Sequence, residues 1–324
     1  MRALVCFLLG VHTLARGGEG LSPPAWHTGM CDASGAVAVS SNLFVVADDE
    51  DNRLRLYRAD RGGAPIKQFD CSSFLQLAGS SAEADLEGAA RLGDRAFWIG
   101  SHGRNQKGKQ RPSRCCLFAT DFRMTGGELT LTPVGKPYRR LLVDLANDPR
   151  FEPFHLAEAA RRAPKEAGGL SIEGLSATPE GHLLIGFRNP VPNGKALLIP
   201  LTNPSEVVEG KPARLDPAIQ LDLGGLGIRD IACHDGTYII TAGSWQGGGH
   251  FRLFTWSGPG AKARLLQVAR LRDCQPEALV IYPQHGLPRF QILSDDGGVL
   301  IDGCPCKDLK NPNRRSFRSY WVTP

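Results

Sequence analysis

A short structural pattern recurs along this 324-residue chain and constrains its fold more than any other feature of the sequence. The clearest copy lies at 168–201, where apolar runs predict strands over 173–178, 182–187 and 195–201. An acidic residue opens the first strand, and a polar residue follows the second strand 15 positions later, as Glu173 and Arg188 do. Because a hairpin returns the chain to the edge where it began, the two positions should lie side by side.

Four further copies of this pattern are visible. They occupy residues 31–58, 84–122, 227–256 and a stretch that begins at 276. The acids that open the five copies are Asp32, Glu87, Glu173, Asp230 and Glu277. The residues that follow the second strands, 15 to 17 positions later, are Asp48, His102, Arg188, Trp245 and Ser294.

Repeated units of this kind predict an all-β fold, a β-propeller of five or six blades in a single domain over 28–324. Five units are legible, and the irregular segment 123–170 allows a sixth. Within that segment we expect strands over 128–134 and 141–145 and a short helical insertion near 153–163. The strand-like C-terminal tail is expected to complete a blade begun by the N-terminus, and a pair of β-sandwiches is the structural alternative.

The first 20 residues predict a possible signal peptide, since Arg2 precedes a short apolar run that ends in small residues. The run is too short to cross a bilayer, so no transmembrane segment is expected. Removing it would take Cys6 and leave eight cysteines, an even number that suits disulfides in an oxidising compartment. We therefore expect a periplasmic or secreted protein, with a cytoplasmic location as the alternative.

The repeat should place its acids around one mouth of the propeller channel. A dense ring of carboxylates is costly unless positive charge compensates for it. Ca²⁺ or another divalent cation could do so, with carboxylate ligands from Glu87, Glu173, Asp230, Glu277 and Asp295. The alternative is a structural ring of ion pairs with nearby arginines.

A cation and arginines together would suit a small anionic ligand such as a phosphoester or another anionic ester. His102, Arg104 and Arg188 are then the candidate catalytic residues, with His102 as general acid or base. The candidate binding residues are Asp32, Asp48, Asn105, Asn189, Arg229 and Trp245. The alternatives are that His102 only makes a hydrogen bond in its loop and that the propeller binds a ligand or protein without catalysis.

Other classes of function find less support in the sequence. The formal net charge of +5 is modest and the basic residues are scattered among acids, so no nucleic-acid surface is expected. The acidic run at 48–52 lacks the spacing and glycine of an EF-hand, and most of it is expected to be a solvated turn. No serine nucleophile elbow occurs, and we expect a monomer.

Several motifs, in order, resemble a bacterial family of unknown function. They are DASG at 32–35, ADDEDN at 47–52, LEGA at 86–89, WIGSHGRN at 98–105, IEGL at 172–175, GFRNP at 186–190 and PEAL at 276–279. The Glu-Gly openings also look like those of esterase-like phytase and gluconolactonase-type propellers. The latter resemblance implies a divalent-metal site to which Glu87 or Glu173 would contribute. Asp295 matches the second metal-binding position only loosely, because Asp296 intervenes before Gly297.

Overall fold

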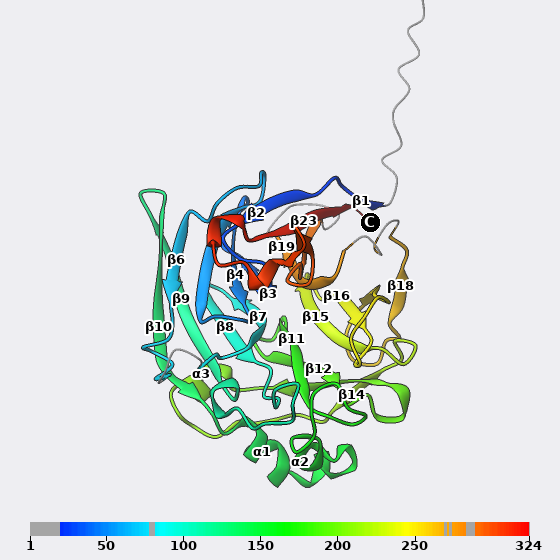
Figure 1. Cartoon of the computed structure of the whole chain (residues 1–324). Helices are drawn as coiled ribbons and strands as arrows, with labels where there is room; N and C mark the ends of the chain where they lie inside the picture. Colours follow the sequence, from blue (N-terminus) through cyan, green and yellow to red (C-terminus); the bar gives the residue numbers. More distant parts are fainter. Residues whose placement is uncertain (1–19, 78–81, 269–270, 272–273, 283–288, 324) are drawn as a thin grey trace, which may run out of the picture.

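The computed structural model describes residues 20–77, 82–268, 271, 274–282 and 289–323. Five antiparallel sheets surround a central channel (Figure 1). The innermost strands β3, β7, β11, β15 and β19 contact one another in that order, and β19 contacts β3. The ring is therefore closed with five blades, which confirms the predicted β-propeller and excludes a pair of β-sandwiches.

Four blades have the same order of strands from the channel outward, each strand pairing with the next. Blade 1 is β3 (Ala33–Ala38), β4 (Leu43–Asp48), β5 (Arg53–Arg58) and β6 (Lys67–Asp70). Blade 2 is β7 (Leu86–Leu92), β8 (Arg95–Gly100), β9 (Leu117–Thr125) and β10 (Glu128–Tyr138). Blade 3 is β11 (Ser171–Ala177), β12 (Leu183–Asn189), β13 (Ala196–Leu201) and β14 (Ile219–Leu221). Blade 4 is β15 (Gly227–His234), β16 (Thr237–Gly243), β17 (Arg252–Trp256) and β18 (Arg264–Leu266).

Blade 5 combines both ends of the described chain. It contains β19 (Pro276–Ile281), β20 (Phe290–Ser294) and β23 (Ser316–Thr323), with β1 (Gly20–Leu21) and β2 (Ala25–Thr28) both paired to β23. This pairing covers the last free edge of the ring, as predicted for the C-terminal tail. A two-stranded sheet of β21 (Leu300–Ile301) and β22 (Cys304–Pro305) lies between β20 and β23 in the chain.

The segment 123–170 does not form a sixth blade. It supplies the outer strand of blade 2 and then the helices α1 (Leu141–Asn147), η2 (Pro149–Phe154) and α2 (Leu156–Ala159). The helical insertion predicted near 153–163 is thus present, but the strand predicted over 141–145 is wrong. Leu141 and Leu145 stand four residues apart and are both buried, which is the spacing of one helix face.

Apolar side chains fill the space between each pair of neighbouring blades. Val45 and Leu54 of blade 1 pack in one cluster with Trp98 and Phe118 of blade 2. Phe97 belongs to the next cluster, which also contains side chains of α1 and blade 3. Burying each such large side chain contributes about 1.5–3 kcal/mol, so contacts between blades provide much of the stability. The remaining helices are α3 (Pro204–Val208) and the short η1 (Pro112–Arg114), η3 (Pro192–Gly194), η5 (Cys306–Asp308) and η6 (Pro312–Arg314).

One disulfide, between Cys31 and Cys306, is present in the described part of the chain. It connects the start of blade 1 to the short helix that follows β22. The expected signal peptide, apart from Gly20, and Cys6 lie outside the described residues. No helix within the described ranges is long and apolar enough to cross a membrane.

Candidate functional site: a charged channel mouth

A cavity of about 250 Å³ lies at the channel mouth where the inner strands begin. All five blades contribute to its lining. Among the residues that the structure describes, nine carboxylates and five basic side chains face it, which leaves an excess of negative charge. Such an excess in a confined space calls for protons, a cation or a cationic ligand.

Each inner strand has a β-bulge near its start, and the bulge turns one extra side chain into the channel. The pairing register shifts at Ala33/Ala36, Leu86/Gly88, Ile172/Gly174, Ile228/Asp230 and Pro276/Ala278. The side chains at these shifts that line the cavity are Ser34, Glu87, Glu173, Arg229 and Glu277. The repeat therefore aligns Ser34 and Arg229 with the three glutamates, whereas the sequence pattern had aligned Asp32 and Asp230 with them.

The glycine that follows the bulged residue lets neighbouring inner strands approach closely. A Cβ atom on Gly88 would lie 2.7 Å from the carbonyl oxygen of Glu173 in the next blade. A Cβ atom on Gly35 would lie 2.5 Å from the backbone of Gly88. The Glu-Gly openings of the repeat thus reflect two needs, a charged group in the channel and a close contact between blades.

One side of the cavity is a chain of ion pairs. Glu173 accepts a hydrogen bond from Arg188 at 2.8 Å and forms an ion pair with Arg229 at 3.0 Å. Arg229 Nε donates to Glu277 at 2.9 Å, which extends the chain from blade 3 to blade 5. All four side chains are nearly inaccessible to solvent. This part of the mouth has structural ion pairs of the kind considered as an alternative from the sequence, but they span blades 3 to 5 and do not complete a ring.

The other side carries carboxylates without cationic partners. Asp32, Asp49, Glu87 and Asp295 form no ion pair with any described residue. Ser34 donates a hydrogen bond to Glu87, and the buried Oδ1 of Asp49 has no hydrogen bond. Asp32 is only 6% exposed, yet no side chain or backbone amide of the described residues donates to its carboxylate. We call these four residues the unpaired carboxylates.

Burial and mutual repulsion raise the pKa values of the unpaired carboxylates. Burial, followed by the charges of Asp295 and Asp48, raises the pKa of Asp32 to about 8. Burial and the nearby charge of Glu87 raise the pKa of Asp49 well above its usual value. The pKa of Glu87 is raised in the same way, by burial and by Glu173. Asp32 therefore holds a proton at neutral pH unless a positive charge joins it, and burial likewise disfavours the ionised forms of Asp49 and Glu87.

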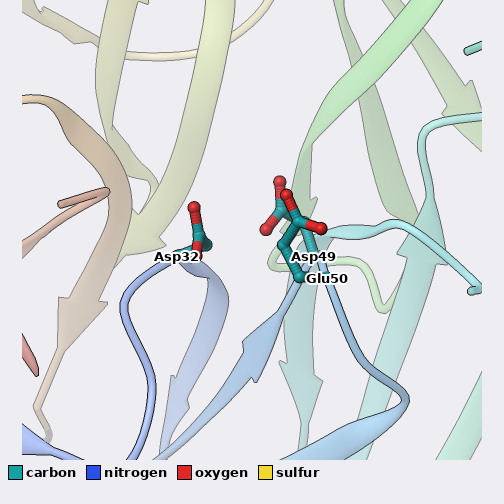
Figure 2. Close-up of side chains that lie close together, drawn as sticks. All are labelled: Asp32, Asp49 and Glu50. Carbon is teal, nitrogen blue, oxygen red and sulfur yellow. The ribbon is translucent and has the colours of Figure 1, made fainter. Parts of the chain in front are cut away.

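The carboxylates form two groups, and the members of each group are close enough to coordinate one cation together. Asp32, Asp49 and Glu50 form one group, with one oxygen from each lying within 4.8 Å of the others (Figure 2). Asp49, Asp85 and Glu87 form the second group by the same measure. Oxygen ligands of this kind suit a hard cation such as Ca²⁺, and Asp49 is common to both groups.

The outer members of the two groups are held by basic side chains. Lys307 donates to Glu50 at 2.9 Å, and Arg114 donates to Asp85 at 2.8 Å. Burial raises the pKa of Asp85 to about 6, although Arg114 opposes this shift. These contacts fix the positions of Glu50 and Asp85 at the rim while Asp49 between them remains without an ion pair.

The structure brings together Asp32, Glu87, Glu173, Arg188, Arg229, Glu277 and Asp295 of the predicted site in the cavity lining. It places the remaining predicted residues elsewhere. Asp48 lies 3.6 Å from Arg55 and accepts the backbone amide of Glu50. Asp230 accepts the amides of Ile231 and of Leu279 in the next blade, so it links blades instead of facing the cavity.

In the loop after β8, Ser101, Gln106 and Arg114 line the cavity, whereas the predicted residues His102, Arg104 and Asn105 do not. His102 is buried, its Nδ1 bonds to the carbonyl oxygen of Gly100, and burial lowers its pKa to about 4. Arg104 donates to the carbonyl groups of Ala160 and Gly108, and Asn105 accepts amides of its own loop. Asn189 donates to the carbonyl groups of Pro164 and Glu166, and Trp245 lies outside the lining.

Several lining residues were not expected from the sequence. They are Asp49, Glu50, Glu83, Asp85, Arg114, Lys165 and Lys307. Asp85 stands two positions before Glu87, but it precedes β7 and has a positive φ of 51°, so the alternation of side chains along a strand could not predict that it faces the cavity. The acidic loop had been interpreted as a solvated turn, but Asp49 and Glu50 both face the cavity. Lys165 and Lys307 come from insertions outside the repeat and carry no comparable pattern.

The fold and this mouth define a five-bladed β-propeller with a polar, ion-lined channel entrance. The chain belongs to the family described as "Protein of unknown function (DUF3616)", whose model matches residues 32–116 and 127–275. This confirms the family resemblance predicted from the motifs. The likeness to phytase and gluconolactonase-type propellers stays a prediction, and no curated protein matches the sequence significantly.

Solved structures with a similar chain path share little sequence with this protein. The major allergen Mala s 1 of Malassezia sympodialis is 12% identical, with 90% of this chain and 78% of that chain covered and a TM-score of 0.40. A GH43_1 enzyme from Xanthomonas citri is 11% identical, with coverages of 91% and 88% and a TM-score of 0.45. Trypanosoma rangeli sialidase is 11% identical, with a TM-score of 0.42, and this chain matches 55% of its length. Similarities of this size carry no conclusion about activity.

Proposed function

We propose that the channel mouth binds a divalent cation together with a small anionic ester and hydrolyses that ester, a phosphoester being the leading candidate. One observation carries the proposal: four carboxylates line one side of the channel mouth and have no cationic partner among the described residues. Protein sites with uncompensated carboxylates of this density favour hard cations with oxygen ligands. We propose Ca²⁺ as the first cation to test.

The residues present fit such a cation. Asp49 offers an oxygen to both carboxylate groups, and Asp32 presents a buried carboxylate to which no described residue donates a hydrogen bond. A bound divalent cation would polarise an ester oxygen and favour ionisation of a water molecule. Glu173 and Glu277 are less suited as ligands, because both are already engaged by arginines.

Hydrolysis at this site would consume one water molecule. The water oxygen forms a bond to the phosphorus atom of the ester, and the bond from phosphorus to the alcohol oxygen breaks. The proton released by the water is taken up by the leaving alcohol oxygen, through the carboxylates of the wall. Carboxyl groups with raised pKa values are suited to such a transfer near neutral pH.

Calorimetry with Ca²⁺ on chelator-treated full-length protein tests the cation, and turnover of p-nitrophenyl phosphate and of a lactone panel tests the reaction. We expect binding in the micromolar to millimolar range found for calcium sites. Asp49→Asn should weaken it at least tenfold, whereas Glu158→Gln should not, because Glu158 is exposed on α2. Absence of cation binding would refute the proposal.

A non-catalytic ligand-binding propeller is the second candidate. The observation that favours it is the position of His102, the expected general acid or base, which does not line the cavity. Cation binding without turnover of any ester, together with ligand binding at the mouth, would support this candidate over the hydrolase. Turnover that Asp49→Asn abolishes would exclude it.

We also propose that the protein acts in an oxidising compartment, the periplasm or the cell exterior. The Cys31–Cys306 disulfide supports this proposal, since such bonds persist mainly outside the cytosol. Fractionation of cells that express the full chain, with thiol trapping, provides the test. Recovery of the protein only in the cytoplasm with Cys31 and Cys306 reduced would refute it.

A further inference from the structure

Lys165 lies at the channel mouth without a partner for its charge. It follows the helical insertion and lines the cavity on the side of blades 3 and 4. Its side chain is exposed, and no ion pair or hydrogen bond joins its ammonium group to any other described residue. A lysine in this setting has three free donors directed at the cavity entrance.

The backbone around Lys165 is held firmly. Asn189, at the end of β12 and 1% exposed, donates one hydrogen bond to the carbonyl oxygen of Pro164 at 2.9 Å and another to that of Glu166 at 2.7 Å. One buried amide group thus binds the residues on both sides of Lys165. The loop is fixed at the mouth while the lysine side chain remains free to contact a ligand.

Arg188 provides a second cationic group with unused donors. Its side chain is 7% exposed, and its Nη1 pairs with Glu173, but its Nε is buried without a hydrogen-bond partner. A buried guanidinium donor that has no acceptor among the described residues indicates a missing acceptor, and Arg188 lines the cavity. Glu173 occupies one edge of the Arg188 guanidinium group, so an oxyanion can approach another edge.

The two cationic groups both lie beside Gly247. A Cβ atom at Gly247 would lie 3.5 Å from Arg188 Nη2 and 3.6 Å from Lys165 Nζ. These are ordinary contact distances, so Gly247 lies directly beside both cationic groups, and its positive φ of 88° is what favours glycine at this position. Burial and the neighbouring charges of Arg188 and Arg229 lower the pKa of Lys165, as expected where cations gather without an anion.

We propose that Lys165 and Arg188 form an oxyanion subsite at the channel mouth that binds the phosphate group of the ligand. The subsite deepens the proposed function, on which it rests for the identity of the ester. Two cationic groups with free donors suit a doubly charged phosphate better than a singly charged carboxylate. The unpaired carboxylates lie in the same cavity, so a cation there and the subsite can hold one phosphoester between them.

Calorimetric titration of the full-length protein with inorganic phosphate, with and without Ca²⁺, tests the subsite, and acetate provides the carboxylate arm. Lys165→Met should weaken phosphate binding about tenfold, Lys165→Arg should retain most of it, and Ca²⁺ affinity should stay within twofold of the unmodified protein. Lys262→Met is the matched control, because Lys262 is exposed and far from the cavity lining.

The outcomes separate this proposal from the cation site. Equal phosphate affinity of Lys165→Met and the unmodified protein, acetate binding as tight as phosphate, or no phosphate binding would overturn the subsite. The cation proposal survives these results if Ca²⁺ still binds. Conversely, phosphate binding that depends on Lys165 in a protein that binds no Ca²⁺ would support the subsite and refute the proposed function.

Discussion

The disulfide between Cys31 and Cys306 joins the two chain segments that carry Asp32 and Lys307. Each of these charged residues directly follows a bonded cysteine. The backbone amide of Lys307 also donates to the carbonyl oxygen of Gly297, and the amide of Asp296 donates to that of Cys31. The disulfide thus lies beside the carboxylate side of the mouth and holds the first blade to the last.

Removing this bond should weaken cation binding as well as the fold. Cys31→Ser combined with Cys306→Ser frees both segments, so we expect the Ca²⁺ dissociation constant to rise several-fold. Loss of a crosslink that spans 275 positions should also lower the free energy of unfolding, by about 2–5 kcal/mol. Calorimetry below the unfolding temperature and urea denaturation measure the two effects.

The control is Cys71→Ser, because Cys71 is a buried free thiol that does not line the cavity. It should leave the dissociation constant unchanged. A doubly substituted protein that remains folded and binds Ca²⁺ as tightly as the original would show that the disulfide does not position the site.

Glu87→Gln should affect cation binding and cation-free stability in opposite directions. The amide keeps the shape of the side chain but removes a charge that interacts unfavourably with Asp49 and Glu173. At pH 8 without a cation, we expect the free energy of unfolding to rise by about 1 kcal/mol. Ca²⁺ affinity should fall at least tenfold, because a potential ligand is lost.

Urea denaturation and calorimetry on the same preparation check both results. Glu209→Gln, an exposed substitution on the outer surface, is the control and should change neither quantity. If Glu87→Gln lowers cation-free stability while cation affinity is unchanged, Glu87 has a structural role in its contact with Ser34.

The repeat was readable from the sequence because each blade must bury two apolar faces and turn at both ends. The strands predicted over 173–178, 182–187 and 195–201 agree with β11, β12 and β13 to within two residues at each end. The number of blades was harder to predict. The long hairpin of β9 and β10 continues beyond the repeat, so the residues after 122 could not be assigned to blade 2.

The site was predicted less completely because small changes of register decide which side chain faces the channel. The bulge in β15 places Arg229 in the cavity and turns Asp230 toward backbone amides of blades 4 and 5. No propensity of the residues specifies such a bulge. The positive φ of 56° at His102 likewise turns its ring back on Gly100, and the spacing of 15 residues carries no information about that turn.

The stability of the cation-free protein should fall as the pH rises from 6.5 to 8.5. In the unfolded chain, aspartate ionises near pH 4, whereas burial keeps Asp32 protonated up to about pH 8 in the folded protein. The folded state therefore binds more protons throughout this window, and stability decreases with increasing pH. The buried His27, whose pKa is lowered to about 4, acts in the opposite direction but only below pH 6.5.

Urea denaturation at several pH values, with a chelator or with saturating Ca²⁺, provides the measurement. Ca²⁺ should remove or reverse the slope, because it binds the ionised carboxylates of the folded state. Its binding should also release protons, which calorimetry in buffers of different ionisation enthalpy detects. Stability that is independent of pH across this window in the chelator would contradict the raised pKa of Asp32.

Asp230→Ala should destabilise the fold and leave cation binding intact. The carboxylate of Asp230 accepts the amide of Leu279 at 2.6 Å and that of Ile231 at 2.8 Å, so the substitution leaves two buried amides without an acceptor. We expect a loss of about 2–4 kcal/mol in the free energy of unfolding. Asp230→Asn, which keeps one accepting oxygen, should lose less, and the exposed Asp216→Ala should have little effect. If Asp230→Asn instead keeps its stability and loses Ca²⁺ affinity, Asp230 is a cation ligand, as the repeat in the sequence had predicted.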